Sequence, residues 1–113
     1  MNFYSAILVY ESSSSAAGYE PLYEETITVF LATSEDHAAE KARAHGRSRQ
    51  VTYENEDRET ITWSFKHLVD VSEVSEEVGD GTEIYTRHFR DYQAYCAFET
   101  LLPQQDSGDR RSL

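Results

Sequence analysis

Two groups of aromatic and acidic residues are the parts of this sequence whose chemistry could form a binding site. One contains Tyr23 and Glu24, and the other combines Trp63 with Glu83 and Tyr85. The further members of the first group are Tyr4, Tyr10 and Tyr19. A buried indole N–H or phenol O–H needs a hydrogen-bond partner, which a glutamate on a neighbouring strand can supply. The same residue types also line polar ligand pockets, so both roles stay open.

The sequence lacks the patterns that usually accompany catalysis or metal binding. There is no glycine-rich phosphate loop, no paired-cysteine zinc pattern and no nucleophile elbow. The four histidines have no spacing that specifies a metal, although His67 and His88 would approach each other if their strands pair. We therefore expect no catalytic residues, no metal and no cofactor.

The charge balance points to the class of partner. Ten Lys and Arg residues stand against 21 Asp and Glu residues, which gives a net charge of −11. The segment from Pro103 onward is neutral, so the excess lies on the part that folds. Such a field repels phosphates and anionic lipids, and it attracts basic proteins. We expect no nucleic-acid or membrane partner. The alternative, that the acidity only keeps the protein in solution, remains open.

Length and cysteine content bound the domain organisation. The 113 residues suffice for one domain, which we place at residues 1–102, followed by a disordered tail at 103–113. Cys96 has no cysteine to pair with inside the chain, and Met1–Tyr10 lacks the features of a signal peptide. These features predict a cytoplasmic protein.

The hydrophobic patterns predict five strands, namely Phe3–Tyr10, Glu25–Ala32, Val51–Glu54, Thr60–Val71 and Thr82–Phe89. The first is apolar almost throughout, which is typical of a central strand. In the fourth, a period of two places one set of side chains inside: Ile61, Trp63, Phe65, Val69 and Val71. Ser12–Gly18 is expected to be a mobile loop.

Two helices complete the predicted fold. Thr33–Gly46 has Thr33 or Ser34 as the N-cap and a face of small alanines. Asp91–Leu102 has Asp91 as the N-cap and an apolar stripe. The predicted class is therefore α+β, an antiparallel sheet of about five strands with helices packed on one face, in the order ββαβββα.

The chain also resembles a bacterial family of small proteins known only as a domain of unknown function. The resemblance covers roughly residues 3–89 and rests on an ordered series of short motifs. These are Tyr4-Ser5-Ala6, Leu22-Tyr23-Glu24-Glu25, the alanine-rich helix 35–44, Tyr53-Glu54-Asn55-Glu56, Trp63-Ser64-Phe65 and Asp80-Gly81-Thr82-Glu83-Ile84-Tyr85. Tyr23 stands where the family usually has Trp. The resemblance implies a shared fold and brings no activity with it.

Three functions are compatible with these features. The first is a non-enzymatic acidic protein that docks on a basic protein, as an immunity protein or an accessory subunit does. The second is a small-ligand or enzymatic site built from Tyr23, Glu24, Trp63 and Glu83. The third is self-association. A concave pocket that gathers these residues would favour the second function, and a flat acidic or apolar patch would favour the first.

Overall fold

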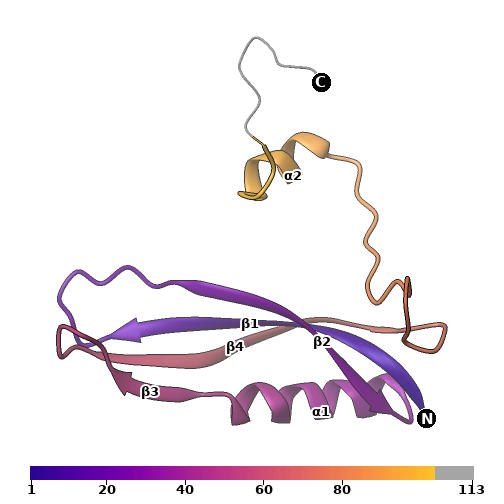
Figure 1. Ribbon diagram of the computed structural model, residues 1–113, viewed down its shortest axis with the longest axis horizontal. Coiled ribbons are helices and arrows are strands. Elements are labelled where there is room, and N and C mark those ends of the chain that lie inside the picture. Colours follow the sequence, from indigo (N-terminus) through magenta and orange to yellow (C-terminus); the bar gives the residue numbers. More distant parts are fainter. Residues whose placement is uncertain (104–113) are drawn as a thin grey trace.

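The computed structural model describes residues 1–103, and it has an antiparallel sheet, one helix packed on the sheet and a second helix set apart (Figure 1). The elements are β1 (Asn2–Ser14), β2 (Tyr23–Ala32), α1 (Glu35–Ser48), β3 (Val51–Glu54), β4 (Thr60–Glu73) and α2 (Tyr92–Phe98). The sheet order is β2-β1-β4-β3. The predicted α+β class is confirmed. Residues 104–113 of the predicted tail lie outside the described residues.

Strand β1 lies in the middle of the sheet, as its apolar sequence predicts. It pairs antiparallel with β2 on one side and with β4 on the other. Its even-numbered side chains from Tyr4 to Tyr10 point toward α1 and are buried. The odd-numbered side chains point to the opposite surface. We call that surface the open face, because it has no helix on it within residues 1–103, although Ile7 at its centre is buried. Its apolar members on β1 and β2 are Phe3, Ile7, Val9, Ile27, Val29 and Leu31.

Helix α1 covers one face of the sheet because its inner side is made of small residues. Ala38, Ala42 and Gly46 are buried against the strands. Ser34, one of the two predicted caps, accepts a hydrogen bond from the backbone N–H of His37 at 3.0 Å. Gly46 lies so close to β4 that a Cβ atom there would stand 2.6 Å from Cδ1 of Phe65. The small side chains thus allow the helix to lie close to the sheet.

The fifth predicted strand, Thr82–Phe89, does not form, so the sheet has four strands and the predicted order ββαβββα is wrong. Gly81 has a φ of 84° and turns the chain away from the sheet before this segment begins. Residues 82–90 then rise from the sheet as an arm that leads to α2 (Figure 1). High strand propensity alone does not make a strand, because a strand needs a neighbour for its backbone hydrogen bonds.

The prediction that both helices pack on one face is also wrong. Within residues 1–103, α1 packs on the sheet, and α2 packs against no strand and not against α1. The N-cap of α2 is nevertheless the predicted one, since Asp91 accepts a hydrogen bond from the backbone N–H of Ala94 at 3.0 Å. Local sequence determined where this helix begins, but not what it packs against.

Two irregularities in β4 change which side chains point inward. The register with β1 shifts between Ile7 and Leu8 and again between Val9 and Tyr10. Each extra residue moves the alternation by one, so Leu68 joins the core beside Val71 while Val69 is 49% exposed. The predicted uninterrupted period of two in this strand therefore fails at its centre.

The serine-rich segment after Tyr10 is more ordered than predicted. Ser12 is fully buried in the continuation of β1, and its hydroxyl lies 2.7 Å from that of Tyr19. Its Oγ also accepts from the backbone N–H of Leu22 at 2.8 Å. Serine lengthens the strand here because its hydroxyl satisfies backbone and side-chain groups of the turn that follows.

The contact between Gly46 and Phe65 predicts that Gly46→Ala destabilises the protein. Alanine improves helix propensity by about 1 kcal/mol, but an overpacked core site costs about 1–3 kcal/mol. We expect the free energy of unfolding, measured with urea, to fall. The matched control is Gly79→Ala, because a Cβ at Gly79 meets nothing within 4 Å. An equal effect of both substitutions would contradict the close packing of α1.

Candidate functional site

A cavity of about 210 Å³ opens on the sheet beyond the C-terminal end of α1. Its lining residues come from four strands and from the segment after the helix, and they are Tyr10, Glu24, Arg49, Val51 and Trp63. The cavity brings together two of the residues selected from the sequence, Glu24 and Trp63.

The strand registers place these side chains beside each other. Tyr10 stands opposite Glu24 on β2 and opposite Phe65 on β4. Trp63 stands opposite Val51 on β3. Paired residues point to the same face of a sheet, so all of these side chains lie on the side that α1 covers only in part. The helix ends before it reaches them, which leaves the space open.

The chain after α1 is held in place by a side chain next to Arg49. The Oε1 atom of Gln50 accepts a hydrogen bond from the backbone N–H of Phe65 at 3.0 Å. This contact ties the end of the helix to β4 and positions Arg49. The Arg49 guanidinium lies over the ring of Tyr10, at 5.7 Å from its centroid. A cation at this position is attracted by the negative face of the ring.

Among the lining residues, Tyr10 is the one with a buried polar atom that has no hydrogen-bond partner. Its side chain is 3% exposed, and its hydroxyl has no hydrogen-bond partner among the described residues. Burial raises the pKa of this hydroxyl, the nearby Arg49 opposes the rise, and Glu24 adds to it. A buried hydroxyl without a partner costs stability.

Glu24 and Arg49 bring opposite charges to the cavity without neutralising each other. In the part of the chain that the structure describes, the only ion pair within 4.0 Å joins Lys66 to Glu11. The cavity therefore offers a carboxylate, a guanidinium, an indole and the side chain of a tyrosine. These groups can bind a small polar molecule.

Tyr23 lies on the other face of the sheet from Glu24, because consecutive strand residues point in opposite directions. Its hydroxyl donates to Oε2 of Glu11 at 2.8 Å, and Lys66 donates to Oε1 of the same carboxylate at 3.0 Å. The hydrogen bonds from Tyr23 and Lys66 hold the pKa of Glu11 below its ordinary value. Tyr23 and Glu24 are neighbours in sequence but belong to different sites.

Glu83 and Tyr85 lie on the arm, away from Trp63. Glu83 accepts a hydrogen bond from the hydroxyl of Thr86 at 3.0 Å, and Tyr85 accepts one from Nε of Arg87 at 3.1 Å. The group of Trp63, Glu83 and Tyr85 does not assemble, because it required the fifth strand. Trp63 itself is half-buried rather than deep in the core.

Sequence reasoning missed two residues of the cavity, Arg49 and Val51. Both follow the end of α1, and their place depends on where the helix ends over the sheet, which no local motif encodes. Tyr10 was considered as a neighbour of Glu24, and the β1–β2 register bears out that proximity. Over residues 1–103, no group of three or more His, Cys, Asp or Glu side chains could hold a metal ion. None of the helices there is long and apolar enough to cross a membrane.

Comparison with known proteins identifies one relationship. Residues 3–86 match the family described as a domain of unknown function (DUF4288). The match covers the sheet, α1 and the beginning of the arm, and it ends before α2. No curated protein and no solved structure matches the chain.

The hydrogen bond from Tyr23 predicts a measurable change in the pKa of Glu11. In Tyr23→Phe this carboxylate loses its largest stabilising contact, so its pKa should rise toward the ordinary value of 4.5. Because the folded-state pKa of Glu11 is lowered, its contribution to stability is present above the ordinary pKa and is lost as the pH falls through the lowered value. NMR titration of the carboxyl carbon measures the shift.

Tyr53→Phe is the control for this titration, since Tyr53 is an exposed tyrosine on β3. A pKa of Glu11 that is unchanged in Tyr23→Phe, or changed equally in both variants, would contradict the contact.

Proposed function

This chain belongs to the DUF4288 family, a domain of unknown function, and we propose that it is a non-enzymatic acidic protein that docks on a basic protein partner. The observation that carries the proposal is the gathering of two acidic segments at one end of the sheet. We call this the acidic end, and its residues are Glu20, Glu54, Glu56, Asp57 and Glu59.

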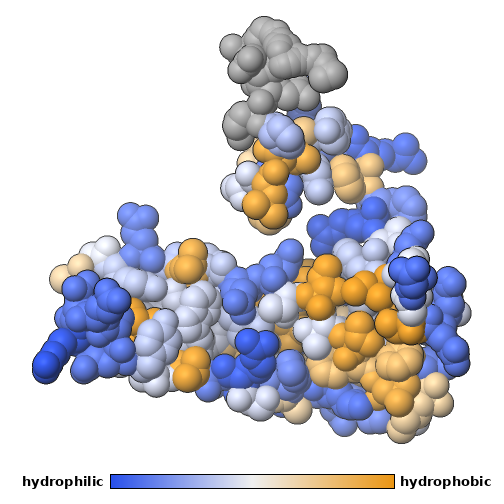
Figure 2. All heavy atoms as spheres, in the orientation of Figure 1, coloured by the Kyte–Doolittle hydropathy of each residue, from blue (hydrophilic) through white to orange (hydrophobic). Residues whose placement is uncertain are grey.

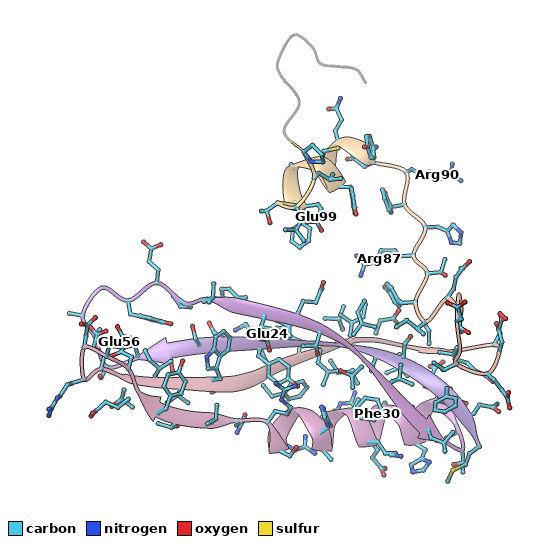
Figure 3. The ribbon with its side chains drawn as sticks, viewed as in Figure 1. Glu24, Phe30, Glu56, Arg87, Arg90 and Glu99 are labelled. Carbon is cyan, nitrogen blue, oxygen red and sulfur yellow. The ribbon has the colours of Figure 1, made fainter. Side chains whose placement is uncertain are left out.

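The acidic end forms because two connections meet there. The β1–β2 connection and the β3–β4 turn lie at the same end of the sheet, where Glu56 is seen (Figures 1 and 3). The backbone N–H of Ser15 donates to the carbonyl of Thr60 at 3.1 Å, and the N–H of Thr60 donates to Oγ of Ser15 at 3.1 Å. Arg58 is the one basic residue in the two segments 20–25 and 54–59.

The basic residues of the folded part lie mainly elsewhere. Half of those in residues 1–103 are on α1 or directly after it, and these are Lys41, Arg43, Arg47 and Arg49. The third acidic segment, Glu73–Asp80, follows β4 at the far end of the sheet. Acidic residues therefore lie at both ends of the sheet, while half of the basic residues lie on or directly after α1, and hydrophilic residues cover the acidic end (Figure 2).

Grouped charges act on a partner more strongly than scattered ones. Fields from charges within about one Debye length, ~8–10 Å at physiological salt, add before the solvent screens them. Such a field raises association rates by about 10- to 1,000-fold for a partner of opposite charge. An immunity protein or an accessory subunit that must capture a basic protein quickly would use an acidic end of this kind.

The test is affinity purification from the native host, followed by association kinetics with the recovered protein. In Glu20→Lys/Glu56→Lys, one charge is reversed in each acidic segment, and we expect the association rate to fall about 10-fold or more at low salt. The control Glu76→Lys/Glu77→Lys changes the net charge by the same amount at the other end. Equal losses in both variants, or a rate independent of salt, would refute docking at the acidic end.

The cavity supports a second candidate function, which we propose as the binding of a compact zwitterion such as a free amino acid. The specific observation is that Glu24 and Arg49, which form no ion pair within the described residues, line one cavity together with Tyr10 and Trp63. A ligand ammonium group would pair with the carboxylate, and a ligand carboxylate would pair with the guanidinium. The volume is below the ~300–1,000 Å³ typical of drug-sized ligands, which restricts the ligand to a small molecule.

Titration calorimetry with a panel of free amino acids tests this candidate. Glu24→Gln should weaken binding about 10-fold or more, while Glu25→Gln, on the opposite face, should leave it unchanged. Tyr10→Phe should leave the free energy of unfolding unchanged or raise it by about 1 kcal/mol, because it removes a buried hydroxyl without a partner. No heat with any amino acid, or equal effects of the two glutamine variants, would exclude this function.

A further inference from the structure

Helix α2 and the residues that flank it carry a row of large apolar side chains that pack on none of the strands and not on α1. They recur every third residue, as Phe89, Tyr92, Tyr95, Phe98 and Leu101, and they are 38–88% exposed. The helix has seven residues and packs against no strand and not against α1. Isolated helices shorter than about 12–15 residues are marginal in water. A short apolar helix of this kind needs a surface to pack on.

The aromatic residues of this row form an organised surface. The rings of Phe89 and Tyr95 stack with centroids 4.8 Å apart, and those of Tyr92 and Tyr95 are nearly parallel at 6.3 Å. Phe89 belongs to the arm, so the stack fixes α2 relative to the end of the arm. The arm and α2 therefore present the apolar row as one unit.

The open face of the sheet is the complementary surface. α1 supplies the second layer on one face, whereas no helix packs on the open face within residues 1–103. Ile27 is 45% exposed and Leu31 is 40% exposed there. Domains are normally built from two packed layers, and the second layer is incomplete here, since Ser5 and Ile7 on β1 are buried while the side chains of Ile27 and Leu31 on β2 stay exposed. Figure 2 shows hydrophobic side chains on α2 and, separated from them, over the sheet.

The arm directs α2 away from its own sheet. An extended run of the nine residues 82–90 spans up to about 30 Å, and the chain rises along it from the end of β4 (Figure 1). The radius of gyration is 18.1 Å, against about 13 Å for a compact chain of about 100 residues. Arg87, halfway along the arm, lies near Glu25 and Asp70, which contribute to raising its pKa after the hydrogen bond to Tyr85. The arm itself therefore takes part of the space over its own open face.

We infer that α2 packs on the open face of a second copy of this chain, and that the second copy returns its own α2, which gives a symmetric dimer by exchange of arms. Each buried aromatic side chain covers about 150–250 Å². Two exchanged rows with the sheet beneath them therefore bury on the order of 2,000 Å², and stable interfaces need about 1,200–2,000 Å². The contact uses the open face and leaves the acidic end free, so it is independent of the function proposed above.

Light scattering coupled to gel filtration tests the inference with the full chain. We expect a mass of twice the 13.0 kDa of a single chain. Phe98→Glu should raise the dimer dissociation constant at least about 30-fold, as the loss of a central interface residue does. Gln93→Glu adds the same charge on the opposite side of α2 and should leave the dimer intact. A monomeric wild-type chain, or a dimer that Phe98→Glu does not weaken, would overturn the exchange.

Crosslinking identifies the surface that α2 occupies. Cys96, exposed on α2, is the only cysteine of the chain and serves as the probe. In Ile27→Cys, a short bifunctional thiol reagent should join the two cysteines between chains and give a crosslinked dimer. A crosslink within one chain would show that α2 folds back on its own sheet, and the absence of any crosslink would show that α2 does not reach this face. Either result would refute the inference.

Discussion

The burial of strand β1 on both sides is the constraint on which the rest of the structure depends. Its neighbours β2 and β4 satisfy its backbone groups, and its even-numbered side chains form the core with α1. A strand in this position cannot shift by one residue, since the shift would exchange its two faces. The register of β1 therefore fixes where Glu24 and Trp63 lie, and with them the cavity.

The same constraint explains why the molecule presents such different surfaces. α1 is long enough to cover only part of one face, and the cavity opens where the helix ends. The antiparallel pairing brings the β1–β2 connection and the β3–β4 turn to one end, which concentrates acidic residues there. On the opposite face Ile7 of β1 is buried, whereas Ile27 and Leu31 of β2 stay exposed. The proposed partner, the alternative ligand and the proposed second copy would thus each meet a separate part of one small sheet.

Sequence patterns predicted the locally encoded features of the fold. The apolar run of β1, the strand Val51–Glu54, the Ser34 cap and the Asp91 cap each depend on a few adjacent residues, and each is found where it was expected. The candidate site was predicted only in part. Glu24 and Trp63 reach the cavity, whereas Tyr23 points to the other face and Glu83 and Tyr85 stay on the arm.

By itself, the sequence determined the class of the protein, most element boundaries and the excess of negative charge, because propensity, capping and net charge are properties of short segments or of simple sums. Only the tertiary structure decided that residues 82–89 form no strand, that Leu68 points into the core and that Arg49 lies over the ring of Tyr10. Each of these depends on contacts between segments far apart in the chain. A strand forms only beside an available edge, a bulge changes the faces only through its partner strand, and a cavity exists only where a helix ends over a sheet.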